Sequence, residues 1–371
     1  MISGSATRIT ELGHAPADGE SRVSAVVDGR PLWFASKDID LIPQPEAFAS
    51  ALMLSTIHRS RPLEMDERVS ATWIRNMDRL FDIWSRWWGY RIPKAAFGVR
   101  EDQQPSTTAS ALAFTCGVDS FFSLLTGRKP DFLVSVHGFD VPLLDTVRMD
   151  AFASSVREIA RETGTRSVVI RTNLRDHPAL GPRRLWDRAH GGGLAAIGHL
   201  LSDHVREFTI SSSYSSRHER PWGSAGETDP LFSSDRISIL HYGVEHSRDT
   251  KLPFIARNAL AQKHLRVCWH NTAEAGNCSR CGKCLATMLV LTEVDALEKF
   301  TVFDGPRVLR SRLDELPYLR NNMNVVQRIV NRGTLPRDIE IATLKLLRRS
   351  RRAAVIREYG SRLRAVLFPH A

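Results

Sequence analysis

The sequence after residue 110 alternates between short apolar runs and longer stretches with helical periodicity. The apolar runs predict buried β-strands at 111–115, 132–136, 167–170 and 208–211. The other stretches predict helices at 119–126, about 145–163 and 194–205. Consecutive strands joined by helices run parallel, because a helical crossover returns the chain to the same edge of the sheet. The sequence therefore predicts an α/β fold with a doubly wound parallel sheet.

Small or polar residues follow each predicted strand. They are Thr115–Ser120, His137-Gly138, Arg171-Thr172-Asn173 and Ser211-Ser212-Ser213. Because the carboxyl ends of parallel strands meet at one edge of the sheet, where such sheets bind ligands, we expect a binding site there. The stretch 214–236 contains Pro, Gly and Ser and is typical of a lid or binding loop. Its candidate substrate contacts are Arg217, His218, Arg220 and Asp229.

The regions that flank this alternating part have other patterns. Apolar runs on either side of Asp28-Gly29 predict a β-hairpin. A stripe of tryptophan and other apolar residues at three- and four-residue spacing predicts an amphipathic helix over 71–88. The predicted organisation is a flexible N-terminus at 1–20, an α+β accessory domain at 21–100, a linker at 101–110, a strand–helix domain at 111–300 and a helical basic extension at 301–371.

The chain is basic, with 51 Lys and Arg residues against 41 Asp and Glu residues. Part of this excess lies in Lys345–Arg352 and continues to Arg357, Arg362 and Arg364. Such a run is either a solvated helix face or a patch for RNA, and the sequence leaves both open. No stretch approaches the ~18 apolar residues of a membrane helix, and residues 1–20 lack an apolar signal region. We expect a cytoplasmic protein without a membrane partner, for which a homo-oligomer stays open.

The segment Thr115–Ser120 lies between a predicted strand and a predicted helix, where backbone N–H groups and the helix dipole favour a phosphate. Its sequence, Thr-Cys-Gly-Val-Asp-Ser, resembles the Ser-Gly-Gly-x-Asp-Ser loop of the PP-loop ATP pyrophosphatases. Gly117, Asp119 and Ser120 match, and Thr115 keeps the hydroxyl group. Cys116 stands where the family has a glycine, so its side chain crowds the phosphates if the backbone needs a positive φ. The alternative is an incidental turn that starts a helix.

The resemblance implies an adenine nucleotide alpha hydrolase-like fold that binds ATP. The implied nucleotide-binding residues are Thr115, Cys116, Gly117, Val118, Asp119 and Ser120, with His137 as a further candidate. Asp119 is a catalytic candidate near the Mg²⁺ that accompanies ATP. Lys251, in Thr250-Lys251-Leu252-Pro253-Phe254-Ile255, partly matches a Thr-Lys-x-x-Ile segment whose lysine approaches the phosphates in related enzymes, and is the second catalytic candidate. His190, before Gly191-Gly192-Gly193, is either a nucleotide contact or an exposed residue at a helix entry.

Four cysteines form the second chemical motif. They are Cys268, Cys278, Cys281 and Cys284, spaced as Cys-x9-Cys-x2-Cys-x2-Cys. Four thiolates close a tetrahedral zinc site without an open position. An iron–sulfur cluster is the second choice, because three closely spaced cysteines with a distant fourth also suit it. The spacing alone does not separate the two.

The order of loop, lysine and cysteine cluster resembles one branch of the family, the 7-cyano-7-deazaguanine synthases of queuosine biosynthesis, over about residues 111–295. It implies an ATP-dependent ligase that adenylates a carboxylate or amide, releases pyrophosphate and uses ammonia as the nucleophile. The segment Gly-Tyr-Pro-Asp-Cys-Arg of that branch is absent from 214–236, so the substrate, a small molecule or a peptide carboxylate, stays open. The alternatives are a tRNA-modifying sulfurtransferase and a nucleotide-binding scaffold protein impaired by Cys116.

Overall fold

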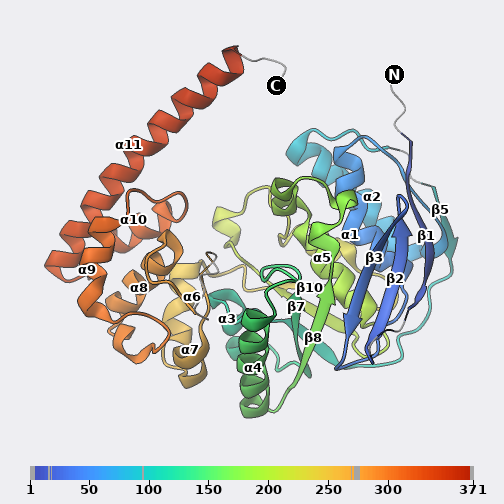
Figure 1. Cartoon of the computed structure of the whole chain (residues 1–371), viewed down its shortest axis with the longest axis horizontal. Coiled ribbons are helices and arrows are strands. Elements are labelled where there is room, and N and C mark those ends of the chain that lie inside the picture. The colour runs from blue at the N-terminus through green and yellow to red at the C-terminus, as the bar shows by residue number, and fades with distance from the viewer. Residues whose placement is uncertain are drawn as a thin grey trace. The chain divides into compact units, whose positions relative to one another are not determined.

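The computed structural model describes residues 5–15, 17, 19–93, 96–268, 270 and 276–367. The chain forms two compact units (Figure 1). The first, here the sheet unit, comprises residues up to 115 together with 123–247. The second, here the helical unit, comprises residues 116–122 and those from 248 onward. These bounds differ from the predicted domain boundaries, because residues on both sides of 101–110 contribute strands to one sheet.

The sheet unit contains one sheet of ten strands. The strands are β1 (Thr7–His14), β2 (Ser21–Val27), β3 (Arg30–Ser36), β4 (Leu63–Ser70), β5 (Ala96–Arg100), β6 (Ser110–Ala113), β7 (Phe132–His137), β8 (Arg166–Thr172), β9 (Glu207–Ser211) and β10 (Ser238–Tyr242). Their order is β10-β9-β6-β7-β8-β3-β2-β1-β4-β5. Among the described residues, only the pairs β8–β3, β3–β2 and β2–β1 are antiparallel. The predicted α/β class is thus confirmed, with a mostly parallel sheet.

Five neighbouring strands of this sheet, β10, β9, β6, β7 and β8, run parallel to one another. The first of them in the chain, β6, is central, with Leu112 beside Leu133 of β7 and Thr209 of β9. The strands β7 and β8 follow on one side of β6, and β9 and β10 lie on the other. The direction in which strands are added therefore reverses between β6 and β9. The four predicted strands are present, whereas β10 was not predicted.

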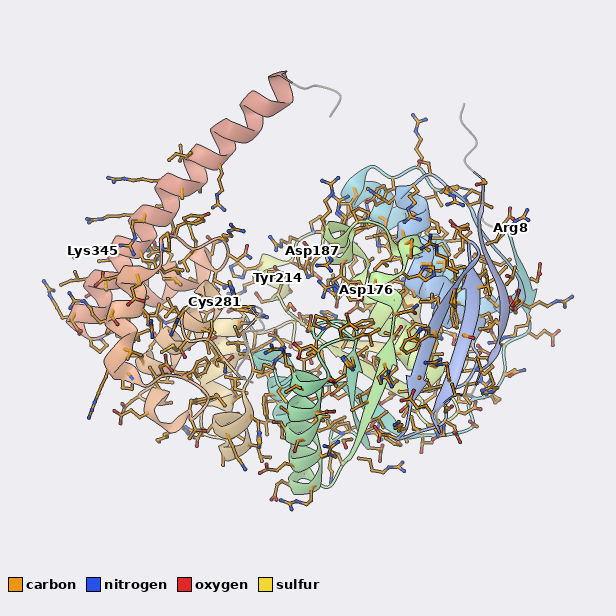
Figure 2. All side chains as sticks on the ribbon, viewed as in Figure 1. Arg8, Asp176, Asp187, Tyr214, Cys281 and Lys345 are labelled. Atoms are coloured by element: carbon orange, nitrogen blue, oxygen red, sulfur yellow. The ribbon has the colours of Figure 1, made fainter. Side chains whose placement is uncertain are left out.

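The N-terminal residues extend the same sheet. Strand β3 pairs with β8 through Phe34 and Thr172, and one hydrophobic core contains both Phe34 and Ile170. Residues 7–14, predicted to be flexible, instead form β1 between β2 and β4. Ile9 is fully buried there, and Arg8 forms an ion pair with Glu64 of β4 (Figure 2). Strand β1 was not predicted because its pairing with β2 is irregular between Thr10 and Gly13, which interrupts the alternation of buried and exposed residues.

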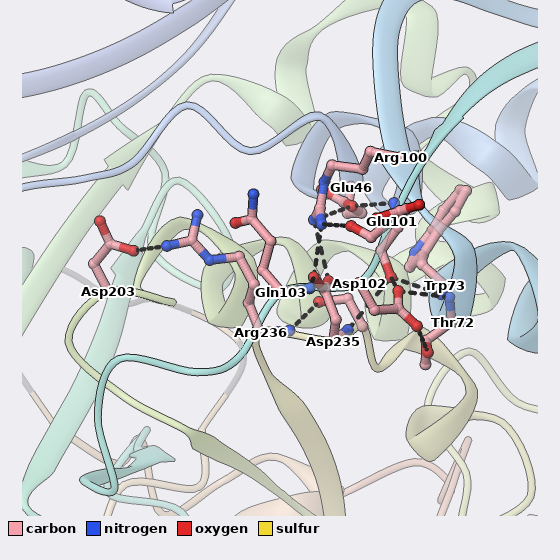
Figure 3. Close-up of polar contacts among 12 residues, drawn as sticks. Glu46, Thr72, Trp73, Arg100, Glu101, Asp102, Gln103, Asp203, Asp235 and Arg236 are labelled. Carbon is pink, nitrogen blue, oxygen red and sulfur yellow. Dashed lines mark hydrogen bonds and ion pairs between the residues drawn. The ribbon is translucent and has the colours of Figure 1, made fainter.

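The stretch 101–110 has no regular structure before β6, as predicted, but it is anchored to the rest of the sheet unit. Asp102 accepts hydrogen bonds from the backbone N–H and the hydroxyl of Thr72 and from the hydroxyl of Ser70. The N–H of Gln103 donates to Asp235 (Figure 3). A stretch held by so many bonds is a fixed part of the unit.

Two local predictions in the N-terminal region are confirmed. Strands β2 and β3 form a hairpin whose two turn residues, Asp28 and Gly29, have φ values of 49° and 78°. Positive φ at both positions is what a two-residue turn of this hand requires, and Asp-Gly tolerates it. Helix α2 (Ala71–Trp88) covers the predicted range; the Ser70 hydroxyl accepts from the N–H of Trp73, and Gly89 ends it in the left-handed region.

Helix α5 spans Trp186–Leu200, so the helix predicted at 194–205 was placed too late in the chain. It begins eight residues earlier and includes the three glycines that were expected to open it. A Cβ atom at Gly192 would lie 2.2 Å from the carbonyl oxygen of Ser50 in α1 (Pro45–His58). The glycines therefore permit close packing of two helices, which outweighs their low helix propensity. Helix α1 was not predicted, because it is buried around its whole circumference and lacks an amphipathic pattern.

The helical unit consists of a segment from the start of α3 (Val118–Thr126) and the chain from α6 onward. Its helices are α6 (Arg248–Ile255), α7 (Ala259–His264), α8 (Gly282–Glu293), α9 (Pro306–Glu315), α10 (Met323–Arg332) and α11 (Arg337–Leu367). The prediction of helices after residue 300 is confirmed. Helix α4 (Thr146–Thr163) belongs to the sheet unit. The short 3₁₀ helices of the two units are η1 (Leu174–Asp176), η2 (Pro178–Leu180), η3 (Arg183–Leu185), η4 (Ser216–His218), η5 (Asp229–Phe232) and η6 (Leu297–Lys299). In the described part of the chain, we find no helix with the length and apolar character to cross a membrane.

Candidate functional site

The loop Thr115–Ser120 joins β6 to α3, as the sequence predicts. The carbonyl oxygen of Gly117 accepts from the N–H of Phe121 (2.9 Å) and from the hydroxyl of Ser120 (3.2 Å), which fixes the first turn of α3. Cys116 has a φ of 54°, so this residue occupies the left-handed region that favours glycine. The backbone therefore has the conformation that a glycine would take without strain, and a cysteine holds it.

The Cys116 side chain is buried, and burial raises the pKa of its thiol, although the charge of Arg266 opposes this. The thiol is therefore protonated at neutral pH and is not an activated nucleophile. The carbonyl oxygen of Cys116 accepts from the N–H of Arg266 over 2.8 Å.

Two basic side chains of α6 converge on Asp119, in the first turn of α3. Arg248 Nη2 lies 2.5 Å from Asp119 Oδ2, and Lys251 Nζ lies 3.3 Å from Asp119 Oδ1. Their three-residue spacing puts both basic residues on one face of α6. Lys251 is fully buried, with its Nζ 5.5 Å from the ring centre of Phe122. The sequence singled out Asp119 and Lys251, and the structure brings them together; Arg248 was not predicted.

The charges around Asp119 favour an anion. Burial raises the pKa of Asp119, but Arg248 and Lys251, with a smaller effect from Lys283, outweigh it and hold the pKa below its ordinary value. The carboxylate is therefore charged at neutral pH, and two cations of α6 contact it. The N-terminus of α3 adds its own partial positive charge. Basic side chains at a helix N-terminus are typical of a phosphate site.

A second set of ion pairs fixes α6 within the helical unit. Asp249, which is buried, accepts from Arg328 (2.6 Å) and Arg332 (3.1 Å) of α10. Arg332 also contacts Glu293 of α8 at 2.5 Å. Because Asp249 lies between Arg248 and Lys251 in the chain, this network determines where α6 presents its two basic residues. These pairs could not be predicted from the sequence, because their members lie far apart in the chain.

The four predicted cysteine ligands lie together. The sulfur atoms of Cys268, Cys278, Cys281 and Cys284 are all within 4.8 Å of one another. Cys281 precedes α8 and marks the cluster in Figure 2. Four sulfur atoms at this spacing fit a single metal ion such as zinc.

Backbone groups and one amide side chain shape the cysteine cluster. The N–H of His270, Cys281 and Cys284 donate to the sulfur atoms of Cys268, Cys278 and Cys281, respectively. Hydrogen bonds of this kind stabilise thiolates. Asn277 Oδ1 accepts from the N–H of Val267 and Cys268, and Asn277 Nδ2 donates to the carbonyl oxygen of Leu265. Asn277, which directly precedes Cys278, therefore binds the segment that carries Cys268 and holds it beside the other cysteine ligands.

Other predicted site residues belong to the sheet unit. His137, the last residue of β7, is buried with Nε2 2.8 Å from the carbonyl oxygen of Pro142. Burial lowers the pKa of His137, so its imidazole is neutral at pH 7. His190 lies inside α5 rather than at a helix entry, with Nδ1 3.1 Å from the carbonyl oxygen of Trp186. Neither residue shows a feature specific to nucleotide binding.

The predicted binding loop 214–236 is mostly irregular and has its own internal contacts. Asp229, a candidate substrate contact, is instead fully buried and accepts from Ser224 Oγ (2.6 Å) and contacts His241 Nδ1 (2.7 Å). The His218 ring contacts Ser215 Oγ at 2.9 Å. The Arg220 guanidinium lies 4.8 Å from the ring centre of Tyr214 and 4.8 Å from that of Trp222. Arg217 is exposed.

None of the family models, curated proteins or solved structures with which the chain was compared matches it. Its function is therefore inferred from the residues and the geometry described above.

Proposed function

We propose that this protein is an ATP-dependent adenylating enzyme of the PP-loop type. The observation that carries the proposal is the convergence of Lys251 and Arg248 on Asp119 in the first turn of α3. A fully buried lysine is costly unless its charge has a purpose or a strong partner. Here Asp119 contacts both cations, and the phosphates of ATP would add negative charge beside them.

The strand order of the sheet unit supports a nucleotide site at the same loop. In open parallel sheets, ligands bind outside the carboxyl ends of strands where the order reverses. That reversal falls between β6 and β9, and β6 leads directly into Thr115–Ser120. A doubly wound sheet of the adenine nucleotide alpha hydrolase kind agrees with this order.

The chemistry follows from these groups. A carboxylate or amide oxygen of the substrate attacks the α-phosphorus of ATP, the bond to the bridging oxygen breaks, and pyrophosphate leaves. Ammonia then attacks the activated carbon, AMP leaves with the oxygen, and the surplus proton passes to water. The backbone N–H groups at the start of α3, the Ser120 hydroxyl, Arg248 and Lys251 hold the phosphates and stabilise the charge on the departing pyrophosphate. Mg²⁺ bound with ATP would supply further neutralisation, and Asp119 is the loop residue whose carboxylate would hold it.

We assign zinc in a structural role to the cysteine cluster. Four sulfur ligands leave no open position for a substrate, and zinc prefers this tetrahedral arrangement. An iron–sulfur cluster stays the second choice. The five cysteines are free thiols, which suits a reducing compartment such as the cytoplasm.

The test is ATP–pyrophosphate exchange with Mg²⁺ in the presence of candidate acids, including 7-carboxy-7-deazaguanine, the acid suggested by the resemblance to 7-cyano-7-deazaguanine synthases. Lys251→Met should lower exchange about 100-fold or more, because it removes a charge that stabilises the transition state. The matched control is Lys299→Met, an exposed lysine in the same unit, which should leave exchange unchanged. If exchange is absent with every acid although ATP binds, the proposal is rejected in favour of the nucleotide-binding scaffold protein, and if ATP does not bind either, both are rejected.

A second candidate function, a tRNA-modifying sulfurtransferase, is favoured by one observation. Helix α11 presents Lys345, Arg348 and Arg352 as an exposed row at three- and four-residue spacing, and Lys345 is labelled on it in Figure 2. Adenylation of a base carbonyl would use the same phosphate loop. AMP release that requires tRNA and a sulfur donor, and not a free acid and ammonium, would select this function.

A further inference from the structure

A group of arginine and aromatic side chains gathers on the sheet unit, and none of them has a part in the proposed reaction. We call it the arginine–aromatic surface. It consists of His58, Arg59, Trp88, Tyr90, Arg184 and Arg188. These residues come from the end of α1, the end of α2 and the chain after it, η3 and the start of α5. Three segments distant in sequence therefore contribute to one surface.

Direct contacts hold the aromatic part together. The Arg188 guanidinium lies 5.3 Å from the ring centre of Trp88 and 5.9 Å from that of Tyr90, and Arg188 Nη1 donates to Tyr90 Oη at 2.8 Å. His58 Nδ1 lies 3.0 Å from the same hydroxyl. The rings of Trp88 and Tyr90 are 5.8 Å apart and both are half-buried, so each presents an edge or face to solvent. These contacts hold the Trp88 and Tyr90 rings and the Arg188 guanidinium in fixed positions.

The surface concentrates positive charge. Burial lowers the pKa of His58, and the charges of Arg188, Arg184 and Arg59 lower it further, which places three guanidinium groups near one imidazole. Arg59 is itself held by the carbonyl oxygen of Pro178 at 2.5 Å. Like charges repel, and the charge of Asp28 opposes this at Arg59, whose pKa burial and Arg61 nevertheless lower.

Stabilisation of helix ends accounts for only two of the four basic residues of this surface. His58 and Arg59 lie at the C-terminus of α1, where a cation is favourable. Arg184 and Arg188 lie instead at the N-terminal end of α5, where the helix dipole disfavours cations and Asp187 is the residue that suits it. Both arginines are exposed. The contacts of Arg188 with Trp88 and Tyr90 hold its side chain in place, and an anionic partner would offset the charge that both arginines add at this helix end.

We infer that the arginine–aromatic surface binds single-stranded RNA. Exposed guanidinium groups at Arg184 and Arg188 pair with phosphates, and Trp88 and Tyr90 provide ring surface against which unpaired bases stack. A simple phosphate site needs no aromatic rings, and a duplex does not expose its base faces. The combination therefore fits an unpaired strand. This inference is independent of the proposed adenylating activity.

The experiment measures fluorescence anisotropy of the full chain with a labelled single-stranded RNA of about ten nucleotides, a length within the range that one binding module covers. Arg184→Ala/Arg188→Ala should weaken binding about tenfold or more and reduce the slope of log affinity against log salt by about two between about 50 and 200 mM salt. The matched control, Arg157→Ala/Arg161→Ala, removes two exposed arginines at the same four-residue spacing from α4 of the same unit and should change the affinity by less than about twofold.

A second pair of variants separates stacking from charge. Tyr90→Leu removes the ring and should weaken binding about tenfold, whereas Tyr90→Phe keeps the ring and should retain affinity. Circular dichroism confirms that each variant is folded. The inference is overturned if duplex RNA of the same length binds as tightly as the single strand, if the α4 variant loses as much binding as the Arg184/Arg188 variant, or if vesicles with anionic lipid bind while RNA does not.

Discussion

The backbone N–H of Arg266 donates to the carbonyl oxygen of Cys116, which joins the phosphate loop to the segment that enters the cysteine cluster. Cys268 follows two residues later, and Asn277 binds the N–H groups of Val267 and Cys268. A metal ion that gathers the four sulfur atoms therefore also fixes the position from which Arg266 holds the loop. In the proposed enzyme, the structural metal acts on nucleotide binding through this contact.

The first prediction is that removing the metal weakens both stability and ATP binding. Elemental analysis should find one zinc per chain, and each tenfold rise in free Zn²⁺ above its dissociation constant should stabilise the helical unit by about 1.4 kcal/mol. Cys281→Ser should lose the metal, because it leaves three sulfur ligands, and should lower the thermal unfolding temperature. Cys116→Ser, outside the cluster, should keep the metal content of the wild type. Equal metal content in both variants would contradict the assignment.

The second prediction concerns the strained residue in the phosphate loop. Cys116→Gly should strengthen ATP binding, because glycine adopts a φ near 54° without cost and leaves no side chain beside the phosphates. The left-handed conformation costs a cysteine about 1 kcal/mol or more, but the variant also loses a buried thiol, so stability should change little. Cys116→Ala is the control, since it keeps Cβ and the strain. If calorimetric titration gives the same ATP affinity for Cys116→Gly and Cys116→Ala, the strain at residue 116 does not weaken ATP binding.

The third prediction is a pH dependence from Asp102. Burial opposes its charge, but hydrogen bonds from Thr72 and Ser70 and the charge of Arg75 outweigh it and lower the pKa of Asp102 to about 2, from 3.8. A lowered carboxyl pKa stabilises the fold above pH 3.8, and that contribution disappears as the pH falls through about 2. Asp102→Asn should therefore be less stable than wild type at pH 5 by about 1 kcal/mol, a value typical of capping bonds. The difference in melting temperature between Asp102→Asn and the wild type should decrease steadily as the pH falls towards about 2.

The fourth prediction tests the buried ion pairs of Arg100. Its guanidinium contacts Glu46 at 2.9 Å and Asp235 at 2.6 Å, and the carboxylates are almost fully buried (Figure 3). Arg100→Met should destabilise the sheet unit by about 3–5 kcal/mol, because it leaves two buried carboxylates without a cation.

Glu46→Gln provides the comparison. Burial raises the pKa of Glu46 even against the charge of Arg100, so neutralising it should cost much less than removing the arginine. In denaturant unfolding, the double variant should be more stable than Arg100→Met alone. A double variant as unstable as the sum of the two would show that the contacts are not coupled.

Features with a local signature could be predicted from the sequence. The turn between β6 and α3, the cysteine spacing, the Asp28-Gly29 turn and α2 each depend on residues close together in the chain. Helix α1 could not be predicted from periodicity, because a helix buried on all sides has no polar face. The partners of Asp119 could not be predicted as a set, because Arg248 is 129 residues away and only the folded chain brings it near.

The last prediction concerns the glycines of α5, whose role the sequence misassigned. At Gly192, an added Cβ would lie 2.2 Å from the backbone oxygen of Ser50, and a backbone atom cannot swing aside as a flexible side chain does. Gly192→Ala should therefore force α1 and α5 apart and destabilise the sheet unit by about 3 kcal/mol, at the upper end of ordinary overpacking. At Gly13, an added Cβ meets nothing within 4 Å, so Gly13→Ala should have little effect on the unfolding midpoint in urea. Greater helix propensity alone would make Gly192→Ala stabilising, so the sign of the change decides whether close packing or local flexibility explains the glycine.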